Sequence, residues 1–95
     1  MNKKYFRITE VTQVCDVSEQ FVLSLERENL ITCVRRKRVK FYPMDQVDRI
    51  RVANVLTKQM GVNLQGVEVA LHLRQQVIDM RREVAILFRR IRQRD

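Results

Sequence analysis

The sequence predicts a mainly α-helical fold: a small helical domain that contains one β-hairpin, followed by a long C-terminal helix. Three observations support this prediction. The 95-residue chain holds only two glycines and one proline, a composition typical of helical proteins. Apolar residues recur at the spacing of one helix face over most of its length. A short basic segment, residues 31–42, instead has the alternation and β-propensity of strands.

Two short helices are predicted near the N-terminus. Thr9 can cap a helix that runs to about Cys15, because its side-chain oxygen can accept a hydrogen bond from an N–H group of the first turn. Ser18 is a good cap for a second helix, and Glu19 directly after it suits the positive end of the helix dipole. This helix is expected to end near Asn29, since asparagine often terminates helices. The pair predicts a helix-turn-helix.

A β-hairpin with a basic tip, a wing, is predicted over residues 30–42. Residues 30–34 are β-prone, and residues 39–42 alternate apolar and basic side chains. The absence of glycine and asparagine at the tip argues against a tight two-residue turn. Residues 31–42 hold five basic side chains and no acidic one, and so carry most of the chain's net charge of +8. The five basic residues are Arg35, Arg36, Lys37, Arg38 and Lys40.

A third helix is predicted from Pro43 to about Met60. Proline suits the start of a helix, and Asp45 in the first turn places negative charge at the positive end of the dipole. Gly61 supplies the stop, because glycine readily adopts the left-handed conformation that follows a helix. Asn63 can then cap the next helix.

The C-terminal segment, residues 64–95, has the most regular apolar pattern. One helix from Leu64 to Gln93 would be about 45 Å long, too long for the winged domain of residues 1–63 to cover, and a bend near residues 73–76 is equally compatible. Its heptad a and d positions are all apolar, which predicts pairing with the same helix of a second copy. Packing onto the chain's own domain is the alternative, and the orientation of paired helices stays open. The predicted dimer seam comprises Ala70, Leu73, Val77, Met80, Val84, Leu87 and Ile91.

The sequence argues against an enzyme. It has a single histidine, His72, no Ser/His/Asp or Cys/His arrangement and no glycine-rich phosphate loop. No cofactor or metal is predicted, since a zinc site would need four ligands and Cys15 and Cys33 have no further cysteine partners. We expect both thiols to be reduced and partly buried. No secretory signal or apolar run of about 20 residues is present, so we expect a cytoplasmic protein that does not span a membrane.

The order of these elements resembles that of MerR-type winged helix-turn-helix proteins. Residues 60–71, above all Gly-Val-Asn-Leu-Gln-Gly-Val at 61–67, are also similar to a segment shared by two related groups. One is HspR, a DNA-binding repressor of chaperone operons. The other is CbpM, a modulator that binds the J-domain of a DnaJ-like (CbpA-like) co-chaperone and inhibits it. The MerR-type resemblance extends over Ile8–Val11, Val17–Ser18, Glu26–Leu30 and Phe41–Ile50.

The second helix favours the CbpM interpretation. MerR-type DNA readers resemble one another in having an arginine and two aromatic residues just before a Glu-Arg pair, where this chain has Leu23, Ser24 and Leu25. Leucine and serine contact phosphates and base edges far less well. The resemblance then implies a homodimer that docks on the basic surface of a J-domain through acidic side chains. The candidates are Glu19, Glu26, Glu28, Asp45 and Asp48.

The alternative is an HspR-like repressor that binds DNA. The net charge of +8 supports it, and the basic hairpin residues Arg35, Arg36, Lys37, Arg38 and Lys40 would then contact phosphates. A hairpin tip kept soluble by its charges would have the same composition. Three carboxylates on the second helix oppose this alternative, because they would lie close to the phosphates of a duplex.

Overall fold

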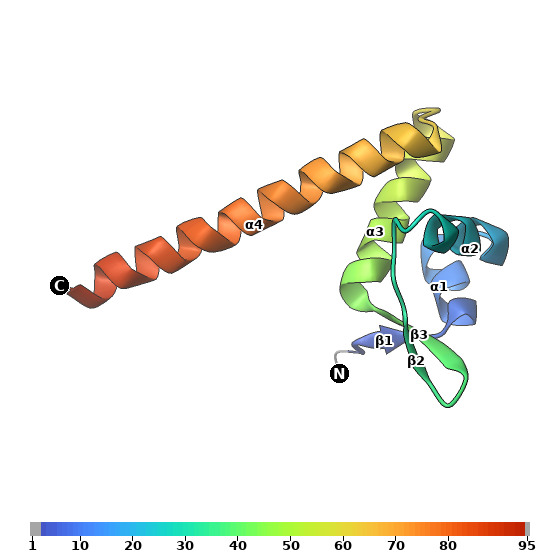
Figure 1. Cartoon of the computed structure of the whole chain (residues 1–95), viewed down its shortest axis with the longest axis horizontal. Helices are drawn as coiled ribbons and strands as arrows, with labels where there is room; N and C mark the ends of the chain where they lie inside the picture. Colours follow the sequence, from blue (N-terminus) through green and yellow to red (C-terminus); the bar gives the residue numbers. More distant parts are fainter. Residues whose placement is uncertain (1–2, 95) are drawn as a thin grey trace.

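The molecule consists of a small head and one long helix that extends from it (Figure 1). The structure is a computed structural model that describes residues 3–94. Its principal extents are 53 × 34 × 21 Å, and the long axis follows the C-terminal helix (Figure 1). The mainly helical fold with a hairpin wing, predicted from the sequence, is confirmed.

The first two helices of the head form a helix-turn-helix. It comprises α1 (Ile8–Cys15) and α2 (Glu19–Arg27). The cap at Ser18 is confirmed, because its Oγ accepts a hydrogen bond from the Phe21 N–H at 3.1 Å. The cap at Thr9 is wrong: the N-cap of α1 is Arg7, two residues earlier, and Thr9 lies inside the helix. At that helix start the Arg7 N–H donates to the Glu10 carboxylate at 3.0 Å, which gives the first turn a different cap.

The wing is part of a three-stranded antiparallel sheet with the order β1-β3-β2. The strands are β1 (Tyr5–Phe6), β2 (Val34–Arg36) and β3 (Val39–Pro43). The sequence did not predict β1, which is only two residues long. The hairpin turn is tight after all: Lys37 and Arg38 alone connect the strands, with φ angles of 50° and 68°. Two-residue hairpin turns require such angles, although glycine and asparagine adopt them more readily.

The β-prone residues 30–33 are not a strand, which corrects the start of the predicted hairpin. Leu30 and Ile31 are buried in the core of the head. The carbonyl oxygen of Leu30 accepts a hydrogen bond from Arg49 Nε at 2.9 Å, and the Thr32 N–H donates to the Gln46 side chain at 2.9 Å. Leu30 and Ile31 therefore contribute to the core, while side chains of the third helix, in place of a neighbouring strand, bind the backbone of this segment.

The third helix has two parts. The α-helical part, α3 (Met44–Asn54), begins after Pro43, which is the last residue of β3 and also the N-cap of α3. A π-helical turn, η1 (Val55–Gln59), follows without a break. The predicted stop at Gly61 is confirmed by its φ of 66°, a left-handed conformation that glycine adopts at little cost.

The segment that resembles HspR and CbpM forms the joint between η1 and α4 (Leu64–Arg94). Asn63 caps α4, since its Oδ1 accepts a hydrogen bond from the Gly66 N–H at 2.9 Å. A Cβ atom on Gly66 would lie 2.5 Å from Cγ1 of Val62, which leaves no room for a larger residue. The spacing of Gly61, Asn63 and Gly66 therefore has a local structural cause: a helix stop, a cap and a close contact.

The core of the head joins every helix to the inner side of the sheet. α4 contributes its two buried residues, Val67 and Leu71, so the first turns of α4 pack against the head. Residues 64–94 form one uninterrupted helix, which settles the open question of a bend near residues 73–76 in favour of a single helix. The buried apolar residues are Val11, Cys15, Val17, Val22, Leu25, Leu30, Ile31, Tyr42, Val47, Ile50, Ala53, Val67 and Leu71.

Candidate functional site

The outer face of α2 is the surface that a helix-turn-helix protein would present to a partner. Val22 and Leu25 are fully buried and hold α2 on the head. Ser24 is half-buried, and its hydroxyl donates to the Phe21 carbonyl at 2.7 Å. Leu23, by contrast, is 38% exposed and lies on the solvent side. Of the three residues just before the Glu-Arg pair, Leu23 is therefore the one whose side chain faces outward.

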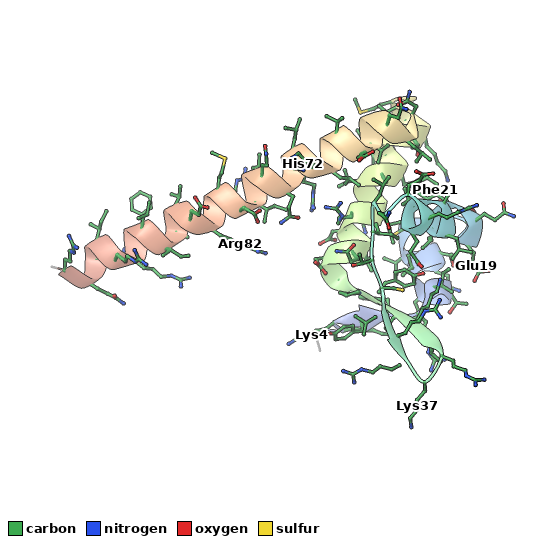
Figure 2. All side chains as sticks on the ribbon, viewed as in Figure 1. Lys4, Glu19, Phe21, Lys37, His72 and Arg82 are labelled. Carbon is green, nitrogen blue, oxygen red and sulfur yellow. The ribbon has the colours of Figure 1, made fainter. Side chains whose placement is uncertain are left out.

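The five candidate docking acids do not gather on one surface. Glu19 and Glu28 are exposed at the two ends of α2, and Figure 2 shows Glu19 pointing into solvent. Asp45 and Asp48 instead line a groove between α3 and α4 whose opposite wall carries Arg74. The structure therefore leaves two of the five on α2 with open access to a partner.

The fifth acid, Glu26, holds the wing against α2. Its carboxylate accepts a hydrogen bond from the Tyr42 hydroxyl at 2.6 Å and forms an ion pair with Lys40 at 2.9 Å. Burial raises the pKa of Glu26, but the contacts with Tyr42 and Lys40 outweigh burial and hold that pKa below its usual value. Burial, together with the hydrogen bond to Glu26, raises the pKa of Tyr42 well above normal. The sequence signal for this link was weak, because its members lie 14 and 16 residues apart.

Four of the five basic hairpin residues project from the wing. Arg35, Arg36, Lys37 and Arg38 are all exposed, and Figure 2 shows Lys37 at the end of the wing, far from α4. Lys40 differs because it is half-buried and paired with Glu26. The projecting tip is therefore a concentrated positive surface.

The predicted seam of α4 is exposed in the single chain. Six of its seven residues, from Leu73 to Ile91, are between 47% and 63% exposed, while Ala70 is half-buried. The stripe therefore does not pack on the chain's own head, which rules out that alternative within one copy. Val67 and Leu71 contact the head from another side of the helix, as expected when successive residues turn by roughly 100°. Figure 2 shows Arg82 on the side of α4 that faces the head.

The remaining chemistry-bearing residues form no catalytic arrangement among the residues described. Cys15 is buried, and its Sγ lies 3.8 Å from the carbonyl oxygen of Val47. Burial raises the pKa of both Cys15 and Cys33, which keeps them protonated at neutral pH. His72 is exposed on α4 beside Gln76. Within residues 3–94, no group of three His, Cys, Asp or Glu side chains has metal-binding spacing.

No helix in the described part of the chain is both long enough and apolar enough to cross a membrane.

The fold and the exposed wing define a winged helix-turn-helix protein. The model of the MerR HTH family of regulatory proteins matches residues 6–89, which is nearly the whole chain. The protein therefore belongs to the MerR helix-turn-helix family of regulators. No curated protein matches the chain. The family match includes the head and most of α4, in agreement with the regulator scaffold predicted from the sequence.

Proposed function

We propose that this MerR-family protein is a chaperone modulator that binds the J-domain of a DnaJ-like co-chaperone and inhibits it. The proposal depends on the outer face of α2. Where DNA readers of the family resemble one another in an arginine and two aromatic residues, this face presents Leu23, a half-buried Ser24 and a fully buried Leu25. Such a surface can make an apolar contact with a protein, but it has few hydrogen-bond donors that could contact base edges.

Charge at the ends of α2 supports a basic protein partner. Glu19 is the first residue of α2, four residues before the exposed Leu23, and Glu28 is the C-cap that follows the helix. The J-domain surface that engages the chaperone ATPase is typically basic in partners of CbpM-like proteins. Opposite charges around a small apolar contact would steer the encounter and orient the complex. The bound modulator would then cover the surface that the chaperone ATPase needs.

A homodimer through α4 is the second part of the proposal. The heptad stripe is exposed over about five helical turns, and monomeric soluble proteins rarely leave so continuous an apolar stripe in water. Pairing two such helices removes the stripe from solvent by coiled-coil packing. A dimer would display two α2 faces and could therefore hold two J-domains.

DNA binding by an HspR-like repressor is the second candidate, and the wing is the observation that favours it. Arg35, Arg36, Lys37 and Arg38 are exposed, and the described part of the chain provides no salt bridge to neutralise them. Phosphate contacts by these side chains would make binding strongly dependent on salt. The α2 face supplies only Gln20 and Arg27 as exposed long-chain donors for bases.

The direct test is a calorimetric titration of the purified protein with the J-domain of the co-chaperone that the same genome encodes. We expect binding, and we expect the J-domain to stimulate the chaperone ATPase less when the protein is added. The Glu19→Lys/Glu28→Lys variant should bind at least tenfold more weakly, a loss of about 1.4 kcal/mol. The matched control, Glu68→Lys/Glu83→Lys, makes the same charge change on α4 and should bind normally. Absence of J-domain binding by the unaltered protein would overturn the proposal.

The competing function is tested with a labelled duplex from the region upstream of the protein's own gene and a scrambled duplex, at about 50 and 200 mM salt. The modulator proposal expects equal binding of the two duplexes, with both affinities collapsing at the higher salt. Tight binding that still prefers the native duplex at the higher salt would instead establish a repressor.

A further inference from the structure

The outer face of the sheet is an aromatic and apolar surface that the helix-turn-helix does not use. In the antiparallel register Val34 lies opposite Phe41, so their side chains share one face. Tyr42, next along β3, is fully buried on the other face. Tyr5 and Val34 are 51% and 40% exposed, and together with Arg36 and Phe41 they line a hollow of about 180 Å³. The hollow thus has an exposed aromatic ring and an arginine at its wall.

The sheet and its flanking residues carry many basic side chains and no acidic ones. Neither residues 1–9 nor residues 29–44 contain an acidic side chain. Among the residues described, two of the basic ones are paired with acids of neighbouring helices, Lys3 with Glu10 and Lys40 with Glu26. The remaining six positive charges have no salt-bridge partner within residues 3–94. The basic residues of the sheet, its turn and its flanks are Lys3, Lys4, Arg7, Arg35, Arg36, Lys37, Arg38 and Lys40.

A second, basic groove lies beside the wing, and its residues Arg35 and Lys40 are on the face of Tyr42, opposite the hollow. It has a volume of about 430 Å³ and runs between the start of α1 and the wing, where Arg7, Arg35 and Arg38 are among its lining residues. The Arg7 guanidinium also lies 5.9 Å from the centre of the Phe41 ring, which borders the hollow. Arg7 and Phe41 therefore connect the hollow, which can hold a planar ring, to the basic groove, which can bind negative charge. In Figure 2 this end of the head, with Lys4 and Lys37, is remote from the end at which α4 joins.

We infer that the outer face of the sheet binds single-stranded nucleic acid. An unstacked base enters the hollow against Tyr5, and the adjoining phosphates lie along Arg36 and Arg7. Aromatic rings beside a positive groove are the physical basis of sequence-tolerant single-strand binding. A base in a duplex is already stacked on both sides and cannot enter such a hollow. This surface does not include α2, so the inference is independent of J-domain binding.

The test is fluorescence anisotropy with labelled oligo-uridine and oligo-thymidine strands of roughly 12 nucleotides, alongside a blunt duplex of equal length. Measurements at about 0.15 M salt reduce purely long-range attraction. We expect the single strands to bind more tightly than the duplex. Tyr5→Leu keeps the apolar volume but removes the ring, and it should weaken single-strand binding at least fivefold. Tyr5→Phe should restore it, and Phe88→Leu, which removes an exposed ring on α4, should bind normally.

Two results would overturn the inference. Equal affinity for single strand and duplex, together with no effect of Tyr5→Leu, would reduce the surface to a charged patch without base stacking. Tyr5-dependent binding of an acidic peptide of equal charge, at the affinity of the oligonucleotide, would instead assign the surface to protein. Circular dichroism spectra that match those of the unaltered protein show that each variant is folded, so a lost affinity reports on the surface.

Discussion

The head and the outer part of α4 both carry apolar residues at regular spacing, yet they differ in where those residues lie. In the head, both helices of the helix-turn-helix have fully buried apolar residues, Val11 on α1 and Val22 and Leu25 on α2. From residue 72 to residue 94, α4 has no buried residue at all. The same kind of apolar pattern therefore forms a buried core in the head and an exposed stripe on the outer part of α4.

The difference shows that helical periodicity specifies which face is apolar, but leaves open what covers that face. In the head, short connections bring other elements of the same chain onto each stripe. α4 is too long for that, because a helix of 31 residues extends about 46 Å. Stability of the head should thus be a property of one chain, while burial of the α4 stripe should depend on protein concentration.

The largest expected effect is a cavity in the head. Leu25→Ala removes a fully buried side chain and should lower the free energy of unfolding by about 2–5 kcal/mol. Urea denaturation followed by circular dichroism at two protein concentrations measures it. Leu23→Ala, two residues away but partly exposed, is the control and should cost clearly less. Equal losses for the two variants would contradict the assignment of α2's buried face.

The second effect concerns the stripe. Val77→Glu/Val84→Glu places two charges in the proposed seam and should raise the dimer dissociation constant about a hundredfold or more, because charges resist burial in an apolar interface. Sedimentation at several concentrations measures the dissociation constant. Ile86→Glu makes the same chemical change at an exposed residue outside the seam. If Ile86→Glu dissociates the dimer equally, or if the unaltered protein is monomeric throughout, the seam assignment is wrong.

A third prediction examines the polar link inside the head. Glu26→Gln loses the ion pair with Lys40 and weakens the hydrogen bond from Tyr42, and should cost about 1–2 kcal/mol at neutral pH. The folded-state pKa of Glu26 lies below its ordinary value of 4.5. The stabilisation is therefore complete above about pH 4.5 and is lost as the pH falls through the lower, folded-state pKa.

The measurement for that link is the unfolding free energy of both proteins as a function of pH. The difference between the unaltered protein and Glu26→Gln should shrink as the pH falls below 4.5. Glu28→Gln, an exposed neighbour, should leave the whole profile nearly unchanged. A constant difference between the Glu26 variant and the parent at all pH values would show that the carboxylate charge does not contribute.

The smallest effect is a gain in stability at the wing. Lys37→Asn/Arg38→Gly supplies residues that prefer the positive φ angles observed there and should stabilise the protein by about 0.5–1 kcal/mol. Thermal unfolding measures the change. Arg36→Asn removes a neighbouring charge from an extended strand residue and should not stabilise. A destabilised turn variant would indicate that the two charged side chains make contacts that outweigh their backbone strain.

Structural features that depend on residues within about one helical turn could be predicted from the sequence. The cap at Ser18, the stop at Gly61 and the cap at Asn63 each depend on groups within three residues, and the structure has all three. The heptad stripe on α4 was readable for the same reason, since a helix repeats its own geometry. The predicted wing is present as well, because alternation along β3 reflects one local pairing.

Contacts between distant segments explain the errors. Residues 30–33 have strand propensity, but burial of Leu30 and Ile31 against the third helix gives them an irregular path. From its position on α2, Glu26 is expected to be an exposed acid, but in the folded protein Tyr42 and Lys40 of β3 contact its carboxylate. Asp45 was assigned to a docking face shared with α2, whereas the direction of α4 places it in a separate groove.

The residue order alone was therefore enough to establish a mainly helical winged protein, its helix boundaries to within a few residues, its basic wing and the apolar stripe of α4. These properties follow from propensity, capping and periodicity, which act between near neighbours in the chain. The packing of the head settled which charges stay exposed, which are paired, and that the stripe faces solvent. Those properties depend on burial and on the direction in which α4 leaves the head, and both arise only when remote segments pack together.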